Sequence, residues 1–185
     1  MEGKASRHKN AEKYQVSVRP NLSKVFKWDS YYSRAGSRVP NANDIQELHA
    51  RATDYLSKFG WCRRILEHYV GFIYPGIVAV FLFKIEPSRA SVDDWVWVVV
   101  GDLPPAYITC EASPNPATAL DSYIGAMEEW VAAAEVGAPT DGLIPVNVPA
   151  TPENAAMLKS RLQFLDKEIL SGYSEDLKEQ PDANA

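Results

Sequence analysis

The pattern of hydrophobic and polar positions is most strand-like at residues 94–100, where valines and tryptophans form an apolar run. β-Branched and aromatic side chains fit a pleated, packed surface better than a helix, so this run predicts a central strand. Gly101, Asp102 and two prolines follow directly. Glycine permits unusual backbone angles, aspartate bonds nearby amides and proline lacks an amide donor. We therefore expect the chain to leave the sheet and turn between Gly101 and Tyr107.

Three further segments have the composition of strands. Residues 65–72 and 77–85 are rich in aliphatic and aromatic side chains and are joined by the turn signal Tyr74-Pro75-Gly76, which together predict a hairpin. Residues 106–110 form the last predicted strand. The connections between these segments are too short for crossover helices, so we expect an antiparallel meander of about four strands.

Helical periodicity predicts about three main helices, at residues 43–59, 116–136 and 152–171. Each begins beside a residue that caps helices well, namely Asn43, Asn115 and Thr151. A shorter helix is predicted at residues 22–32. The strands lack strict alternation, which indicates helices on both faces of part of the sheet and an α+β fold class. The apolar stripe of the last helix is predicted at Ala155, Leu158, Leu162, Leu165 and Ile169.

The length of 185 residues, 46% of them hydrophobic, favours one domain with one substantial core. We expect a flexible polar tail at residues 1–12, a single α+β domain at 13–172 and an acidic flexible tail at 173–185. The two cysteines, Cys62 and Cys110, have no metal-ligand spacing and are expected to be buried thiols. We expect neither a metal nor a cofactor.

Charge is unevenly distributed along the chain. The net charge is −5, but residues 1–64 hold 13 Lys/Arg and 6 Asp/Glu, whereas residues 65–185 hold 6 and 18. We expect the two halves to compensate within the fold or across a homodimer, and we expect no nucleic-acid partner because RNP and KH motifs are absent. The N-terminus lacks the apolar core of a signal peptide, and the longest uncharged run, residues 69–83, is too short to span a bilayer. The expected compartment is the cytoplasm, without membrane association.

Catalytic motifs such as the P-loop, the G-x-S-x-G elbow and H-E-x-x-H are absent. His49 is expected to face solvent, and His68 to be a hydrogen-bonded structural residue of a half-buried strand. Asp93, Asp94, Asp102 and Glu111 stand near strand ends, and two of them could share a rim, as paired acid and base groups do. The usual role of aspartate at such a turn is to bond the backbone.

The aromatic residues offer a second kind of candidate site. Trp95 and Trp97 point to one face of their strand, where a covering helix would make them core residues. Left uncovered, they would form an apolar platform for a peptide or a small ligand. The candidate binding residues are Trp97, Asp102, Leu103, Pro104 and Tyr107, with His68 and Glu111 as secondary candidates.

The run W-V-W-V-V-V-G-D-L-P-P-A-Y at residues 95–107, the helix at 123–130 and the segment 151–162 resemble an uncharacterised family of small bacterial proteins. The resemblance covers about residues 44–170 and implies a bacterial cytosolic α+β domain, without an activity or catalytic residues. We therefore expect a non-enzymatic binding or interaction protein, such as a regulatory or immunity-type partner. The alternative is a small-molecule-binding or hydrolase-like enzyme with a site near the turn from Gly101 to Tyr107.

Overall fold

The computed structural model describes residues 19–35 and 42–179, and these form an α+β fold around one antiparallel sheet. The sheet is a meander in which each strand pairs with the next one in the chain. Its strands are β1 (Phe26–Lys27), β2 (Cys62–Tyr74), β3 (Val78–Pro87), β4 (Trp95–Gly101) and β5 (Leu103–Thr109). The predicted fold class is confirmed.

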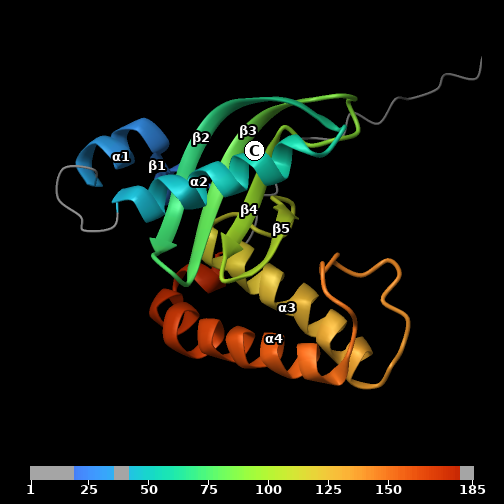
Figure 1. Ribbon diagram of the computed structural model, residues 1–185. Coiled ribbons are helices and arrows are strands. Elements are labelled where there is room, and N and C mark those ends of the chain that lie inside the picture. The colour runs from blue at the N-terminus through green and yellow to red at the C-terminus, as the bar shows by residue number, and fades with distance from the viewer. Residues whose placement is uncertain (1–18, 36–41, 180–185) are drawn as a thin grey trace, which may run out of the picture.

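Helices cover both faces of the sheet, as the continuous apolar strands predict. Helices α1 and α2 lie on one face, and α3 and α4 lie side by side and antiparallel on the other (Figure 1). The helices are α1 (Trp28–Ala35), α2 (Ala42–Ser57), α3 (Pro116–Glu135) and α4 (Pro152–Phe164). A π-helical turn (Leu165–Ile169) and a 3-10 turn (Leu170–Tyr173) continue α4.

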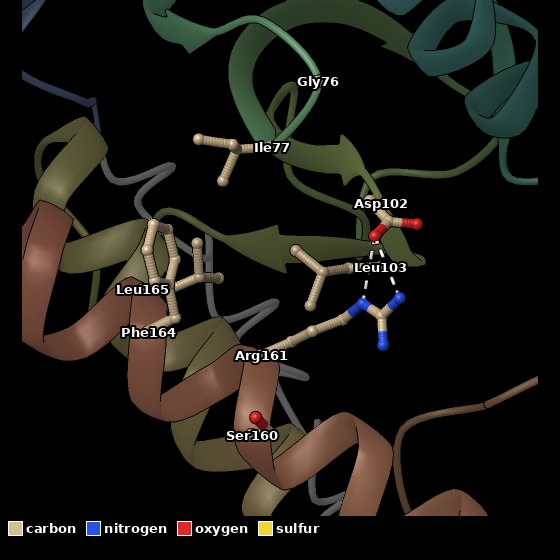
Figure 2. A pocket seen from close by; sticks show the side chains of 8 residues that line it. All are labelled: Gly76, Ile77, Asp102, Leu103, Ser160, Arg161, Phe164 and Leu165. Atoms are coloured by element: carbon tan, nitrogen blue, oxygen red, sulfur yellow. Dashed lines mark hydrogen bonds and ion pairs between the residues drawn. The ribbon is translucent and has the colours of Figure 1, made fainter.

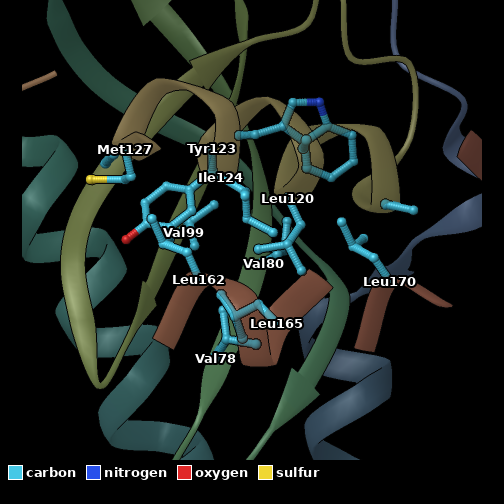
Figure 3. Close-up of a cluster of buried hydrophobic side chains, with 14 of the residues drawn as sticks. Val78, Val80, Val99, Leu120, Tyr123, Ile124, Met127, Leu162, Leu165 and Leu170 are labelled. Atoms are coloured by element: carbon cyan, nitrogen blue, oxygen red, sulfur yellow. The ribbon is translucent and has the colours of Figure 1, made fainter. Parts of the chain in front are cut away.

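The sheet therefore separates two apolar cores. Phe81 and Val98 point towards α2, whereas Val80 and Val99, next to them in β3 and β4, join side chains of α3 and α4 in the second core (Figure 3). Trp95 and Trp97 belong to this second core and are 6% and 0% exposed, so they are core residues and form no platform. Cys62 and Cys110 are both buried and free, in the first and the second core respectively.

The exit from β4 differs from the prediction. β5 begins at Leu103, so Pro104 and Pro105 lie within a strand, and the turn is reduced to the short link between Gly101 and Leu103, which pair with each other. β5 is an edge strand, where a proline can lie without depriving an inner ladder of a hydrogen bond. The prediction that the prolines lie outside the sheet is therefore wrong.

The N-terminal part of the described chain also differs from the predicted helix at residues 22–32. It forms a 3-10 turn (Leu22–Lys24), then β1, then α1. β1 pairs at Phe26 with Val70 and at Lys27 with Tyr69. This two-residue strand adds the fifth strand to the four that were predicted.

The two ends of the described chain meet at the N-terminus of α3. The side chain of Asn115 accepts hydrogen bonds from the amides of Ala117 and Thr118, and its Nδ2 donates to the Glu179 carboxylate at 2.8 Å. Lys24 Nζ pairs with the Asp176 carboxylate at 2.6 Å. Residues 173–179, the first part of the predicted acidic tail, thus pack against the domain, while the predicted tail at 1–12 and residues 180–185 lie outside the described residues.

Candidate functional site

The link between β4 and β5 forms one wall of the cavity that we call the turn groove. The groove has a volume of about 370 Å³, and its other walls are α4 and residues 146–148. Buried Trp130 of α3 and Leu158 of α4 also line it. The lining residues used below are Arg51, Asp102, Leu103, Pro104, Pro105, Val148, Met157 and Arg161.

A second, smaller cavity lies on the other side of Asp102, and we call it the side cavity. It has a volume of about 220 Å³ and is bounded by Gly76 and Ile77 of the β2–β3 turn and by Phe164 and neighbouring residues of α4 and the π-helical turn (Figure 2). Asp102, Leu103 and Arg161 line both cavities. The two cavities are therefore neighbours that share one boundary.

An ion pair forms this boundary. Arg161 reaches from α4 to the link. Its Nε donates a hydrogen bond to Oδ2 of Asp102 at 3.1 Å, and its Nη2 forms an ion pair with the same oxygen at 3.0 Å (Figure 2). The side chains of Arg161 and Asp102 remain 46% and 68% exposed. Exposed ion pairs contribute only about 0–1 kcal/mol, so this contact can be exchanged at little cost.

A second arginine approaches the link from the opposite face of the sheet. The guanidinium of Arg51, which belongs to α2, donates from Nη2 to the carbonyl oxygen of Gly101 at 2.9 Å. The link is thus held between an arginine of α2 and an arginine of α4. The charged side chains that line the two cavities are these two arginines and Asp102, which gives the lining a net positive charge.

The backbone of the link is constrained by close packing. Gly101 has a φ of +156°, and a Cβ at this position would collide with the carbonyl oxygen of Ile77. The amide of Asp102 donates to that same oxygen at 3.0 Å. Because the backbone of the link is fixed to the β2–β3 turn, the Asp102 side chain is directed outwards to Arg161.

Exposed apolar side chains surround the two cavities. Val148, Met157 and Phe164 are 49%, 56% and 46% exposed. Met157, Arg161 and Phe164 follow one another at spacings of four and three residues, so they share a face of the helical segment. This face is apolar at both ends and charged in the middle.

The structure brings together three of the seven predicted site residues. Asp102, Leu103 and Pro104 line the turn groove. Trp97 is fully buried, and its Nε1 donates to the Ser113 carbonyl at 2.8 Å. The other three predicted residues, His68, Tyr107 and Glu111, lie elsewhere.

Tyr107 and Glu111 line a different cavity, of about 330 Å³, together with Trp61 and Asp93. The Tyr107 ring packs edge-on against Trp61 with centroids 5.0 Å apart, so it belongs to an aromatic cluster at the end of α2. Burial, followed by the charges of Glu111 and Asp94, raises the pKa of Asp93. Of the four carboxylates considered for a shared rim, Asp93 and Glu111 line this cavity together, whereas Asp102 lines the turn groove.

His68 pairs with His49, which corrects the expectation that His49 faces solvent. Nε2 of His49 and Nδ1 of His68 lie 2.9 Å apart, and the Trp28 ring stacks on His49 with centroids 3.8 Å apart. Burial, and secondarily the neighbouring His68, lowers the pKa of His49 to about 4, and burial also lowers the pKa of His68. The pair joins α2 to β2.

Sequence reasoning missed Arg51, Met157, Arg161 and Phe164. The two arginines contact the link from positions 50 and 59 residues away in the chain, which no local pattern reveals. The two apolar residues did leave a signal, because both fall outside the predicted apolar stripe of the last helix. An apolar side chain outside such a stripe faces solvent or a ligand.

Comparison of the chain with protein-family models, with curated proteins and with solved structures gave no match. The resemblance to a family of small bacterial proteins stays a prediction. Within residues 19–35 and 42–179, no three His, Cys, Asp or Glu side chains are grouped as a metal site. No helix in this part of the chain has the length and apolarity needed to cross a membrane.

Proposed function

We propose that this chain is a non-catalytic binding protein that holds an extended peptide segment of a protein partner in the turn groove. The observation that carries the proposal is the set of exposed apolar side chains, Val148 and Met157, beside the rigid Pro104-Pro105 pair around a preformed cavity. Ligand sites typically combine such an apolar lining with a few polar groups that fix orientation. A regulatory or immunity-type role in the bacterial cytoplasm belongs to this proposal.

The chemistry of the lining supports binding more than catalysis. Among the described residues that line the turn groove and the side cavity, the ionisable groups are Arg51, Asp102 and Arg161, and Asp102 is already paired. A hydrolase-like site would need a general base or nucleophile within reach of an activating partner. His68, Asp102 and Tyr107 are distributed over separate parts of the molecule, so the enzymatic alternative has less support.

A peptide-display selection tests the proposal. Random peptides are selected on the wild-type protein, and the affinities of the enriched peptides are measured for three variants. Met157→Glu and Val148→Glu should weaken binding by about tenfold or more, because each puts a charge into the apolar wall. Leu66→Glu, at an exposed leucine of β2 outside the groove, is the matched control and should bind as the wild type does.

Two results would contradict this function. One is a selection from which no peptide emerges with saturable binding. The other is a set of enriched peptides that bind Met157→Glu and Val148→Glu as tightly as the wild type, which would place their site outside the turn groove.

A further inference from the structure

The position of the Arg161–Asp102 ion pair indicates more about the partner segment. The pair stands on the boundary between the turn groove and the side cavity, and its two members line both. Apolar side chains are present on either side of it. Met157 lines the turn groove, and Ile77 and Phe164 line the side cavity (Figure 2). A segment that fills both cavities must cross the ion pair.

The ion pair leaves part of the binding capacity of Arg161 unused. Both nitrogens that contact Asp102 share its Oδ2 atom. A guanidinium and a carboxylate bind best as two parallel hydrogen bonds that use both carboxylate oxygens. An incoming carboxylate with freedom to align can therefore form a better pair with Arg161 than Asp102 does, since the backbone of Asp102 is fixed at the Ile77 carbonyl.

The local charge favours an anionic group at this point. Arg51 and Arg161 flank the single carboxylate of Asp102, and the other polar side chains of the lining, such as Asn154 and Ser160, are neutral. The molecule as a whole carries a net charge of −5. The two cavities thus form a locally positive site on an acidic protein, and such a site attracts negatively charged groups.

We propose that the partner segment carries an acidic side chain flanked on both sides by apolar residues, and that its carboxylate binds Arg161 in place of Asp102. The carboxylate could belong to the C-terminus of the segment or to an internal side chain, and the presence of two cavities favours the side chain. A C-terminal carboxylate would end the segment at Arg161 and fill one cavity, whereas an internal Glu or Asp lets apolar side chains enter both. This inference rests on the proposed function and specifies the ligand class of the same site.

Three synthetic peptides test the inference on the full chain. The first is acetyl-Ser-Leu-Val-Glu-Leu-Val-Ser-amide, the second has glutamine in place of glutamate, and the third ends at the glutamate with a free carboxylate. Affinities are measured by NMR titration, with the Nε–Hε signal of Arg161 as a local probe. The first peptide should bind about tenfold more tightly than each of the others, because only it offers both a carboxylate and two apolar flanks.

Two protein variants give the inference its sharpest test. Asp102→Asn keeps the shape of the side chain but removes the competing charge, so it should tighten binding of the glutamate peptide by about threefold to tenfold and leave the glutamine peptide unchanged. Arg161→Gln should abolish the difference between these two peptides. If Asp102 had only a structural role in the link, Asp102→Asn would give the opposite result, because it would weaken binding of both the glutamate and the glutamine peptide.

The outcomes separate the inference from the function on which it rests. If the glutamate and glutamine peptides bind the wild type equally well and neither binds Met157→Glu, the inference is wrong but the turn groove remains the binding site. Tighter binding of the third peptide than of the first would overturn the internal position of the carboxylate. If none of the three binds while display-selected peptides do, the inference fails and the proposed function stands.

Discussion

Gly101 is the residue on which the geometry of the β4–β5 link depends. Its φ of +156° lies in a region that residues with a side chain rarely adopt, and the carbonyl oxygen of Ile77 occupies the place of a Cβ. Its own carbonyl oxygen accepts the hydrogen bond from Arg51. One residue thus determines both the direction in which Asp102 projects and the anchoring of Arg51.

The variant Gly101→Ala should lower the free energy of unfolding by about 2–4 kcal/mol, because the added methyl group must displace backbone atoms and the residue is held at a strained angle. Urea denaturation followed by tryptophan fluorescence measures the change. Gly125→Ala is the matched control: Gly125 is an exposed residue inside α3 with open space around its Cβ position. Alanine there should raise the free energy of unfolding by about 0.5–1 kcal/mol. Equal effects of the two substitutions would contradict this account of the link.

At the residue scale, the sequence could identify the wall of the turn groove that the β4–β5 link forms. Asp102, Leu103 and Pro104 were predictable because they interrupt the most strand-like run, and that interruption is a local feature. Arg51 and Arg161 were not, because their roles depend on how α2 and α4 are placed across the sheet. His49 shows the same limit: its position outside an apolar stripe suggested solvent, but the facing His68 and the Trp28 ring half-bury it.

At the scale of elements, the N-terminus of α3 is more extensively hydrogen-bonded than that of α4. Asn115 is fully buried, accepts from the amides of Ala117 and Thr118, and donates to the Asp176 carbonyl and the Glu179 carboxylate. It therefore combines the role of an N-cap with that of a tie between α3 and the C-terminal turns. In α4, by comparison, the side chain of Thr151 accepts from one amide, that of Asn154.

Replacing Asn115 with alanine should accordingly cost about 2–4 kcal/mol of unfolding free energy, since it removes a cap and leaves buried polar groups without partners. Thr151→Ala, which removes a cap only, should cost about 1 kcal/mol. Thermal and urea denaturation of the two variants measure the difference. If Asn115→Ala is no more destabilising than Thr151→Ala, the tie to the C-terminal turns contributes nothing to stability.

The elements themselves could be predicted where a signal is local. Two of the three predicted caps, Asn115 and Thr151, are confirmed, and so are the hairpin around Tyr74-Pro75-Gly76 and the periodicity of α2, α3 and α4, because each signal lies in a short stretch of sequence. The third predicted cap, Asn43, is wrong, because α2 begins at Ala42 and Asn43 lies inside it. β1 could not be predicted, because a two-residue strand has no pattern of its own and exists only through its pairing with β2. The prediction for Pro104 and Pro105 failed for a related reason. A missing amide donor excludes a proline from an inner strand but not from an edge strand, and β5 lies at the edge of the sheet.

At the scale of the whole molecule, the histidine pair links the helical layer of α1 and α2 to the sheet. His49 lies on α2, His68 on β2, and Trp28 of α1 stacks on His49. The negative charge of Asp29 favours protonation of both imidazoles. Burial opposes protonation and is the larger effect, so the pKa values of both histidines are lowered. The folded layer therefore holds both histidines in the neutral form more firmly than the unfolded chain does.

This arrangement predicts that the protein loses stability as the pH falls from about 6.5 to about 4. An unfolded histidine binds a proton near pH 6.5, whereas His49 in the folded protein does so only at a pKa of about 4. Between these values His49 binds more protons in the unfolded state, so its contribution to the free energy of unfolding decreases with falling pH. For His49 alone the loss is on the order of 1–2 kcal/mol, because solvent screens the half-buried imidazole. The lowered pKa of Glu67, caused mainly by its hydrogen bond from Tyr69, adds a loss in the same direction below about pH 4.5.

Urea denaturation at a series of pH values across this range measures the effect, and His49→Gln is the variant that isolates it. Above the pKa of ordinary carboxylates, the change in the free energy of unfolding with pH should come from the histidines in the wild type. His49→Gln should therefore show a flatter dependence of this free energy on pH between about pH 6.5 and 4.5. At neutral pH the variant should be less stable than the wild type. The smaller slope of the His49→Gln profile is the diagnostic result, because a substitution that merely weakens packing would lower the curve without changing its slope. Parallel profiles would mean that the layer of α1 and α2 is joined to the sheet by contacts that do not depend on neutral histidines.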